Sequence, residues 1–570
     1  MAVAVPIPAW LSPVADFLFT GNEANASVEA VLLVLCLAGM LVLRGRPFRG
    51  FARVEAALKR WAASERRALT LALAFPLVAR IALLGVYPPP QPWVHDEFSY
   101  LLIADTLQEG RLTNPTHPLW EHFETIHVFF QPTYSSKYPV GNGVVLALPL
   151  LVGLPPYVGI WLGCSFLSGA VYWMLRAWVP AHWALFAALL LLARESVMSG
   201  WMHTYWGGAV AGTGGALAIG ATARLLQAAR RRHAWILGGG IFLLAITRPY
   251  EGFALTLVLG AALLLWLVRS GAERGKRLEA VLVPLLVSMT ATAGFVALHN
   301  YTVTGDPTLL PYAHNRSLYG TPQSFYWQDP VPPPPVFRHK QLADNYRWQL
   351  DVRREVDSAA SWLRSVGWKM KEFWLFFIGP ALTIPLLFLF TGRRPKRLGL
   401  LMGAVGAVLL AVNCYPFFYY HYFAPIAGLI LLFQLLGLEA MRRWRPPWGV
   451  HLARTVAIVL VLSYAWQIGL DMLHKTQRKN ADRPRNQVER ALDEMGGHHV
   501  VIVRYAPDHD FHHEIVYNAA DIDSSPIVWA RDMGPLKNQE LETYYRGRKF
   551  WSFEPDQKPP RLTPYQGLRF

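Results

Sequence analysis

The sequence predicts an all-α polytopic membrane protein of about twelve transmembrane helices, with large outer loops and a small C-terminal α/β domain. Of its 570 residues, 53% are hydrophobic and 16% are charged, whereas soluble proteins average about 25% charged residues. Several apolar runs approach the ~20 residues that a helix needs to cross a bilayer. Basic clusters fall in alternate connections between these runs, as the positive-inside rule expects of cytoplasmic loops.

The predicted spans follow one another along the chain with short connections, apart from two long loops. They lie near 27–43, 68–87, 157–176, 181–198, 207–226, 234–249, 252–269, 279–299, 370–391, 398–414, 423–440 and 451–470. The apolar stretch 140–154 contains Gly141 and Gly143 and precedes Pro155 and Pro156. We expect a re-entrant or interfacial segment there, because a full crossing would place the later arginine clusters outside.

The formal net charge of +16 does not indicate nucleic-acid binding, because the positive charge is spread over short connections between apolar runs. These connections lie at 44–67, 230–232, 269–277, 393–397 and 442–445. The other loops hold aromatic, acidic and histidine residues, so we expect them outside. This charge bias is typical of a multi-pass protein of the bacterial inner membrane, with its outer loops in the periplasm or facing the exterior.

Five segments emerge from this pattern. They are an extra N-terminal span with a basic cytoplasmic linker (1–67), a helical block containing an outer loop at 88–139 (68–300), a second outer loop (301–369), further transmembrane helices (370–470) and an outward-facing tail (471–570). In the tail, buried strands are predicted at 500–503 and 526–529, a helix at 538–545 and a possible third strand at 550–553. The tail therefore predicts a small α/β domain.

Two adjacent carboxylates, Asp96 and Glu97, follow an apolar run at the start of the first outer loop. The region 92–109 predicts a helix that ends at Gly110, so both acids lie in its first turn, where the helix dipole favours negative charge. Neighbouring positions on a helix point about 100° apart, so we expect the two acids to have different roles. The alternative is that both only cap the helix.

The rest of this loop favours a functional site over simple capping. Polar and aromatic side chains accompany the acids at high density, including His95, Lys137 and Tyr138. An interfacial belt would account for the aromatic residues alone. It would not account for so many ionisable groups. We therefore select these three residues as candidate substrate-binding residues.

Several stretches of this loop together carry a resemblance to a known family. His95-Asp-Glu-Phe-Ser-Tyr100, the stretch 111–118, the stretch 131–134 and Lys137-Tyr-Pro139 resemble a bacterial subgroup of the GT-C superfamily of polyprenyl-phosphate-dependent glycosyltransferases. The subgroup belongs to the protein O-mannosyltransferase and aminoarabinose-transferase branch. The resemblance covers roughly residues 68–440.

The resemblance implies an inverting transfer of a sugar from a polyprenyl-phosphate donor to a hydroxyl or amine acceptor. Such a transfer needs a base to take the proton of the acceptor, and Asp96 stands at the family's position for it. Glu97 would orient the acceptor or a metal ion. Some members of the superfamily use a divalent metal ion and others do not, so the cofactor stays open here, with Asp96 and Glu97 as its ligands if one binds.

Other outer turns supply further candidates for substrate binding. Arg248 and Glu251 lie between two spans, where charges are costly unless they are paired or functional, so a structural ion pair is the alternative. His203 lies in an aromatic, glycine-containing turn, and an interfacial belt is the alternative there.

Three more candidates come from later in the chain. Tyr312 belongs to the second outer loop, for which a purely structural role is the alternative. His421 and Tyr422 precede an outer helix start, where they can donate hydrogen bonds to a departing phosphate. The alternative for His421 is ordinary packing among aromatic residues.

A multi-span secondary transporter of a polar or lipid-linked substrate is the rival class. Transporters keep charged groups at mid-membrane depth, whereas the charges here gather in outer loops, which favours surface chemistry. The predicted partners are a polyprenyl-phosphate sugar donor, membrane lipid and an acceptor that is a glycan, a lipid or a protein. No nucleic acid is expected.

Overall fold

The computed structural model describes residues 20–42, 49–269, 271, 274–320, 324–328, 336–391, 397–473 and 483–567. Parts of the predicted basic clusters at 44–67, 269–277 and 393–397 lie outside these residues. Every predicted span overlaps a helix. The helix in 68–87 ends at Ala82, that in 181–198 ends at Leu191, and 370–391 contains a break described below. The helices are α2 (Thr20–Val42), α4 (Glu65–Ala82), α7 (Tyr157–Leu175), α8 (Ala181–Phe186) with the π-helical turn η3 (Ala187–Leu191), α10 (Ala209–Leu225), α11 (Arg231–Ala245), α12 (Pro249–Val268), α13 (Arg274–Thr304), α16 (Ala359–Phe377), α17 (Gly379–Phe388), α18 (Leu398–Val412), α19 (Ala427–Arg443) and α20 (Trp448–Leu473).

Six of the described helices are long and apolar enough to cross a membrane, or seven if one bent pair counts as a single span. The chain is therefore a multi-pass membrane protein, and the count of about twelve crossings stays a prediction. The predicted span at 370–391 is not one straight helix, because α16 and α17 meet at 94°. Gly379 at the bend has a φ of +65°, and Pro380 follows it, so the α-helix cannot continue through this point.

The segment predicted to be re-entrant or interfacial forms the short helix α6 (Gly141–Leu150). Ten residues of helix extend only about 15 Å, too short for a crossing. A Cβ atom on Gly143 would lie 2.2 Å from the side chain of Ile103, and one on Gly159 would lie 2.2 Å from the carbonyl oxygen of Val145. Glycine therefore allows α6 to pack closely between α5 and α7.

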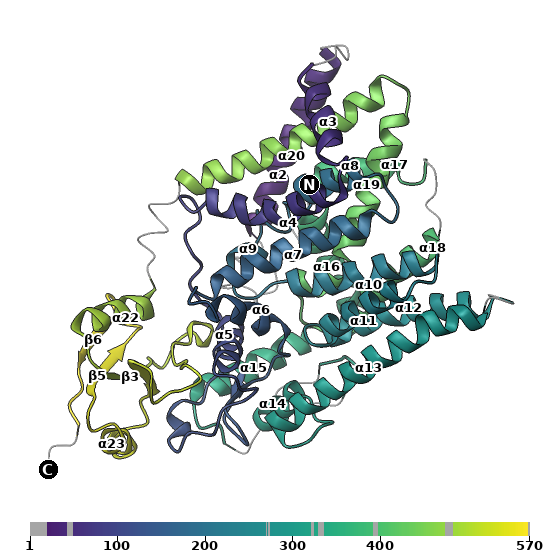
Figure 1. Ribbon diagram of the computed structural model, residues 1–570. Helices are drawn as coiled ribbons and strands as arrows, with labels where there is room; N and C mark the ends of the chain where they lie inside the picture. The colour runs from purple at the N-terminus through teal and green to yellow at the C-terminus, as the bar shows by residue number, and fades with distance from the viewer. Residues whose placement is uncertain are drawn as a thin grey trace.

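Shorter elements occupy the connections between these helices. They are α3 (Arg49–Trp61), α5 (His95–Gln108), η2 (Trp120–His122), β1 (Val128–Phe129), β2 (Ser135–Ser136), α9 (Gly200–His203), α14 (Pro311–Tyr319), α15 (Lys340–Arg354) and η5 (Tyr420–Ile426). In Figure 1, α5 lies beside the C-terminal domain, α15 and α14 lie toward the bottom of the helical body, and α3 lies at the top. The predicted helix at 92–109 is thus confirmed as α5, and Gly110 after it has a φ of +71°.

The basic connections meet one another away from α5. Glu55 of α3 accepts hydrogen bonds from Arg442 at 2.8 Å and from Arg454 at 3.1 Å. Arg397, before α18, donates to the carbonyl oxygen of Leu226 at 2.6 Å. The predicted cytoplasmic connections therefore gather at a common end of the bundle, as the alternation of charge along the sequence requires.

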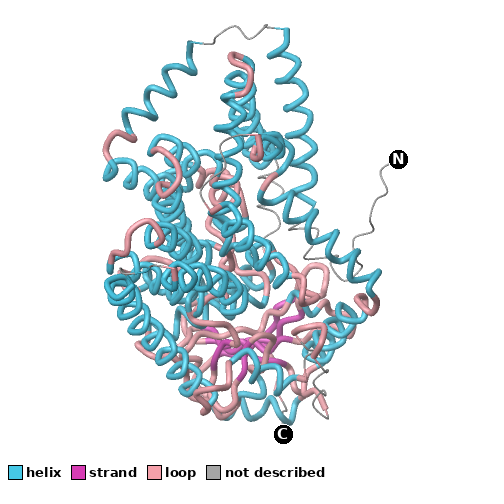
Figure 2. The backbone as a smooth tube through the Cα atoms, turned by 90° about the vertical axis from the view of Figure 1, so that its right-hand side faces the viewer, coloured by secondary structure: helices cyan, strands magenta, loops and turns pink. Residues whose placement is uncertain are grey.

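The tail folds into a four-stranded sheet with the order β4-β3-β5-β6. Its elements are α22 (Pro484–Met495), β3 (His499–Val503), η6 (Phe511–His513), β4 (Ile527–Arg531), α23 (Pro535–Tyr544), β5 (Lys549–Glu554) and β6 (Arg561–Pro564). The central strand β3 runs parallel to β4 and β5, and β6 is antiparallel to β5. Figure 2 shows the strands together at one end of the helical body. The three predicted strands and the helix are confirmed, whereas α22 and β6 were not predicted.

Candidate active site

Asp96 lies in the first turn of α5, and its side chain is 20% exposed. The hydroxyl of Tyr138 donates a hydrogen bond of 2.5 Å to Oδ1 of Asp96. Its Oδ2 lies 3.9 Å from Nε2 of His127. Asp96 is therefore held by one strong donor and retains access to solvent, which suits a group that must accept a proton.

Glu97 is buried and has a different set of partners. Its Oε2 accepts hydrogen bonds from the backbone nitrogens of Trp93 at 2.6 Å and Val94 at 3.1 Å. Its Oε1 accepts one from the backbone nitrogen of Tyr205 at 3.0 Å. Burial raises the pKa of Glu97, and these donors oppose the rise. The residue thus caps its own helix and fixes α5 to the turn after α9. The predicted role of Glu97 in orienting an acceptor or a metal ion stays a prediction.

Lys137 is a buried cation whose charge interacts with that of Asp96. Its Nζ lies 5.0 Å from the ring centre of Tyr312, 5.1 Å from that of Tyr138 and 3.5 Å from Nε2 of His127. Burial lowers the pKa of Lys137 to about 7, although Asp96 acts in the opposite direction. Asp96 therefore lies beside a lysine that titrates near neutral pH.

His127 is a site residue that the sequence reasoning did not select. Burial and the charge of Lys137 lower its pKa well below the usual value, so its imidazole is neutral. Its φ is +66°, a left-handed conformation that is uncommon for a residue with a side chain. The only signal in the sequence was its place in the same polar loop. Backbone strain of this kind often accompanies function, but it is visible only in the structure.

Tyrosine side chains surround the carboxylate. Tyr100 stacks on Tyr138 with 4.7 Å between ring centres. Burial, followed by the charge of Asp96, raises the pKa of Tyr138 well above its usual value. Burial also raises the pKa of Tyr312. Both hydroxyls therefore stay protonated, and that of Tyr138 already donates its hydrogen to Asp96.

Arg248 lies directly before α12 and is enclosed. Its guanidinium carbon lies 4.5 Å from the ring centre of Tyr422, and its Nη1 lies 3.9 Å from Oε1 of Glu251. The hydroxyl of Tyr415 donates to the same carboxylate oxygen at 2.8 Å. Burial disfavours the charge on Arg248, but Glu251 outweighs it and the pKa is raised. The predicted pair exists, and the arginine charge is retained.

His421 and Tyr422 lie on η5 beside these residues. The ring of His421 stacks on Tyr419 with 5.5 Å between centres and lies 5.6 Å from Trp206. Tyr422 contacts His421, with 5.0 Å between ring centres, and joins it to Arg248. The structure thus brings Asp96, Lys137, Tyr138, Tyr312, Arg248, Glu251, His421 and Tyr422 into one region.

His203 and His95 have other surroundings. Nε2 of His203 lies 3.0 Å from the carbonyl oxygen of Val197, and its ring lies 4.5 Å from that of Tyr87. None of these described partners belongs to the group around Asp96. Nδ1 of His95 is 2.7 Å from the hydroxyl of Tyr517 in the C-terminal domain, and its ring meets His127 edge-on at 5.6 Å. His95 therefore connects that domain to the site.

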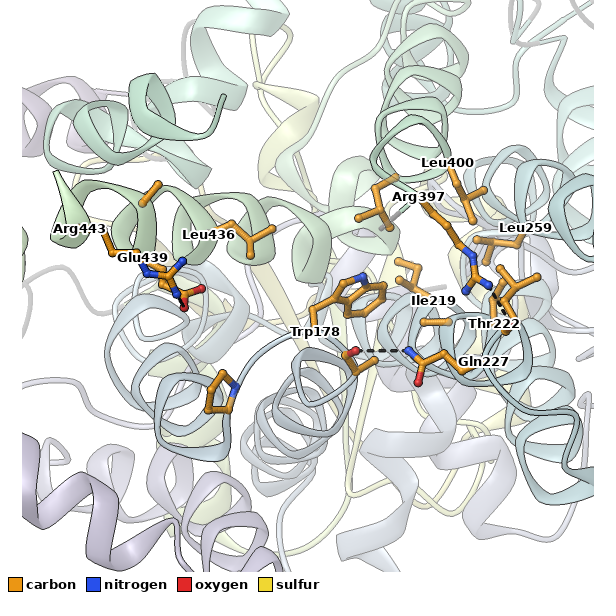
Figure 3. A pocket seen from close by; sticks show the side chains of 16 residues that line it. Trp178, Ile219, Thr222, Gln227, Leu259, Arg397, Leu400, Leu436, Glu439 and Arg443 are labelled. Atoms are coloured by element: carbon orange, nitrogen blue, oxygen red, sulfur yellow. Dashed lines mark hydrogen bonds and ion pairs between the residues drawn. The ribbon is translucent and has the colours of Figure 1, made fainter. Parts of the chain in front are cut away.

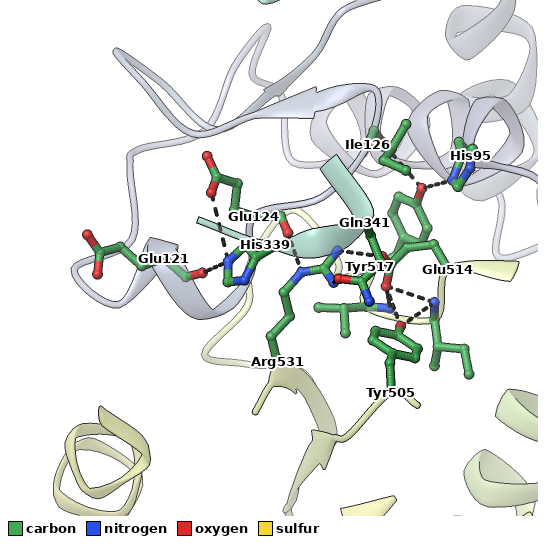
Figure 4. Close-up of polar contacts among 12 residues, drawn as sticks. His95, Glu121, Glu124, Ile126, His339, Gln341, Tyr505, Glu514, Tyr517 and Arg531 are labelled. Atoms are coloured by element: carbon green, nitrogen blue, oxygen red, sulfur yellow. Dashed lines mark hydrogen bonds and ion pairs between the residues drawn. The ribbon is translucent and has the colours of Figure 1, made fainter. Parts of the chain in front are cut away.

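The C-terminal domain docks through a buried polar network (Figure 4). Arg531 of β4 forms an ion pair with Glu514 and donates to Oε1 of Gln341 at 3.0 Å and to the carbonyl oxygen of Glu124 at 2.7 Å. The network joins the tail, the first outer loop and α15. A small cavity of about 10 Å³, lined in part by His127 and Lys137, lies between α15 and the site.

The residues around Asp96 do not by themselves fit a divalent metal ion. Among the described residues, no group of three or more His, Cys, Asp or Glu side chains could hold one. The partners closest to Asp96 are a phenol, an imidazole and an ammonium group, whereas Mg²⁺ and Mn²⁺ prefer several oxygen ligands. The oxygens of Glu97 already accept backbone hydrogen bonds.

The fold resembles that of a protein of known structure. No protein-family model matches the chain, and no curated protein does. ArnT from Cupriavidus metallidurans bound to undecaprenyl phosphate aligns with a TM-score of 0.50 and 13% identity, over 86% of this chain and 93% of that one. The apo state of ArnT gives a TM-score of 0.49 and 12% identity, over 85% and 92% of the two chains. The first alignment shows that the two proteins share a fold.

Proposed function

We propose that this protein is an integral-membrane inverting glycosyltransferase. It moves a sugar from a polyprenyl-phosphate donor to an acceptor at the outer face of the membrane, and Asp96 is the general base. The hydrogen bond of 2.5 Å from Tyr138 to the partly exposed Asp96 carboxylate is the observation that carries the proposal. ArnT, which shares the fold, was solved with undecaprenyl phosphate, and a lipid of that class is the proposed donor carrier.

In the proposed reaction, the acceptor oxygen or nitrogen attacks the anomeric carbon of the donor sugar from the face opposite the phosphate. Asp96 takes the acceptor proton as the new bond forms. The bond between the anomeric carbon and the phosphate oxygen breaks, and the phosphate leaves with the electron pair. The configuration at the anomeric carbon is inverted. Tyr138 keeps the carboxylate oriented throughout.

The departing lipid phosphate needs positive charge and hydrogen-bond donors. Arg248 supplies a permanent cation, because Glu251 raises its pKa despite burial. Lys137 supplies a second cation below about pH 7. His421 and Tyr422 lie next to Arg248 and complete the proposed phosphate site.

The same proposal implies an orientation of the protein in the membrane. Arg442, Arg454 and Arg397 lie at the basic end of the helical bundle. The positive-inside rule assigns this end to the cytoplasm. Asp96 then faces the periplasm or exterior of a bacterial inner membrane, where a lipid-linked sugar is an available donor. The proposal covers a glycan, lipid or protein acceptor in the cell envelope.

The test compares cells that express the wild type, Asp96→Asn or Glu109→Gln. Glu109 caps the other end of α5 and is exposed, so its variant removes one negative charge from the same helix. Mass spectrometry of lipid-linked sugars and surface glycans should show a missing product and accumulated donor in Asp96→Asn alone. Equal product in Asp96→Asn would refute the proposed base. Adding EDTA, then Mg²⁺ or Mn²⁺, to membranes decides whether a metal ion takes part.

A further inference from the structure

A cavity of about 730 Å³ lies between α7, α10, α12, α18 and α19 (Figure 3). Its lining includes Arg397 and Glu439, and within the described part of the chain no residue of the group around Asp96 belongs to it. Arg397 lies at the basic end of the bundle, away from α5. The attacking atom of the acceptor must therefore be bound elsewhere, by direct neighbours of Asp96.

The two oxygens of the Asp96 carboxylate have different surroundings. Oδ1 accepts the hydrogen bond of Tyr138, whereas Oδ2 lies 3.9 Å from Nε2 of His127. That distance is too long for a direct hydrogen bond, but one oxygen or nitrogen atom between them could lie about 2.8 Å from both. The side chains of Asp96 and His127 are 20% and 16% exposed, so neither is sealed from an approaching acceptor.

The imidazole of His127 is able to bind such an atom. Burial lowers its pKa well below the usual value, and a neutral ring carries one N–H donor and one acceptor nitrogen. The contact of its Nε2 with Lys137 is 3.5 Å long, at the outer limit of a hydrogen bond, so Nε2 is available. A hydroxyl would accept from Nε2–H and donate to Oδ2 of Asp96, whereas an amine would donate to both.

The backbone at His127 is held from both sides in its left-handed conformation, with a φ of +66°. Its carbonyl oxygen accepts hydrogen bonds from Oγ of Ser99 at 2.8 Å and from the backbone nitrogen of Lys137 at 3.1 Å. The preceding carbonyl oxygen, of Ile126, accepts one from the hydroxyl of Tyr517 at 3.3 Å (Figure 4). Strain of this kind persists only where the surroundings over-determine it.

Tyr517 is the contribution of the C-terminal domain to this arrangement. It is 5% exposed, and its ring stacks on Phe98 of α5 with 4.3 Å between ring centres. Its hydroxyl also lies 2.7 Å from Nδ1 of His95. These contacts fix the position of the hydroxyl that holds the Ile126 carbonyl, so the tail supports the peptide group before His127.

We propose that His127 binds the attacking atom of the acceptor between its Nε2 and Oδ2 of Asp96, and that Tyr517 is the positioning residue that keeps His127 there. His127 transfers no proton. The acceptor proton passes to Oδ2 of Asp96 as the new bond forms at the anomeric carbon, and the phosphate leaves with its electron pair. The inference rests on the proposed function, because it assigns a role within the same reaction.

The first test replaces His127 by Asn and by Gln in the full-length protein and measures product in cells by mass spectrometry, beside Asp96→Asn. Asparagine tolerates a positive φ, so His127→Asn should fold, which thermal unfolding checks. Its side chain is too short to reach the position of Nε2, so transfer should fall about tenfold or more. His127→Gln places an amide nitrogen near that position and should recover part of the transfer.

The outcomes of this test separate the inference from the proposed function. Wild-type transfer in His127→Asn, or no recovery in His127→Gln, would overturn the role of His127. Wild-type transfer in Asp96→Asn would instead refute the proposed base.

A second test concerns the hydroxyl of Tyr517. Tyr517→Phe keeps the ring on Phe98 and removes only the hydroxyl, so transfer should fall about two- to tenfold, the range of one hydrogen bond. Tyr545→Phe is the matched control. Tyr545 also belongs to the C-terminal domain and lies 3.2 Å from Nε2 of His117 in the first outer loop, but its hydroxyl donates to Asp523 at 2.6 Å. Transfer in this control should equal that of the wild type.

The double variant shows whether Tyr517 acts through His127. Effects that share one route are not additive, so Tyr517→Phe should cause no further loss in the His127→Asn background. Equal loss of transfer in Tyr517→Phe and Tyr545→Phe, or losses that multiply in the double variant, would overturn the positioning role.

Discussion

Replacing Lys137 by Met should change how the stability of the protein depends on pH. Burial lowers the pKa of Lys137 in the folded protein to about 7, whereas an unfolded lysine titrates near 10.4. Between these values the unfolded chain binds more protons than the folded one. The free energy of unfolding of the wild type should therefore rise with pH above about 7, and the penalty for the buried charge is largest below that pH.

The size of this effect on stability follows from the difference between the pKa of Lys137 in the folded and unfolded protein. Two pH units in this window correspond to about 3 kcal/mol for one fully linked proton. Lys137 is 8% exposed and lies against the rings of Tyr138 and Tyr312, so a methionine fits the same apolar contacts. We expect Lys137→Met to be more stable than the wild type at pH 6, and the difference should shrink toward pH 9.

Thermal unfolding in detergent, followed by tryptophan fluorescence between pH 6 and pH 9, measures this difference. Lys340→Met is the control, because it removes a half-exposed lysine from α15. Its stability should follow the wild type across the whole range. If the stability difference between Lys137→Met and the wild type does not change with pH, the buried lysine does not titrate as argued.

Three further changes test other parts of the structure. Tyr138→Phe removes a hydrogen bond to the proposed catalytic carboxylate, worth about 1.5–3 kcal/mol, so transfer measured with a lipid-linked donor should fall at least tenfold; an unchanged rate would show that the contact is not catalytic. Arg531→Met leaves Glu514 buried and unpaired, which should cost about 3–5 kcal/mol and expose the C-terminal domain to limited proteolysis, whereas persistent protection would mean that other contacts hold it. A Cβ on Gly215 would lie 1.9 Å from a carbonyl oxygen of η5, whereas a Cβ on Gly239 would have nothing within 4 Å. Gly215→Ala should therefore lower the free energy of unfolding by about 1–3 kcal/mol, and Gly239→Ala should not. Equal effects of the two substitutions would contradict the packing described.

The helical segments were readable from the sequence because hydrophobicity over about twenty residues is a local property. The break between Ile378 and Gly379 was missed, because the glycine and proline lie inside an otherwise apolar run. In the structure Arg194 donates to the carbonyl oxygens of Leu375 and Phe376. These contacts satisfy backbone acceptors next to the bend, and they join residues that are far apart in the sequence.

Part of the candidate site could be predicted from the sequence for a related reason. Asp96 and Tyr138 belong to one loop, and a short hairpin in which Val128 pairs with Ser136 lies just before Tyr138. Ser99 and Ser136 then lie 2.6 Å apart through their Oγ atoms. The contribution of the C-terminal domain was not predicted. Tyr517 reaches His95 from a part of the chain more than four hundred residues away.

The sequence by itself determined the run of apolar helices, the basic end of the bundle, the strands of the tail and the polar loop that holds Asp96. Each of these follows from composition and spacing within a short stretch. Only the tertiary structure decided that Glu97 caps α5, that Arg248 joins the aromatic residues of η5 and that the tail docks beside His95. Those roles depend on burial and on hydrogen-bond partners supplied by distant segments, which a linear pattern does not encode.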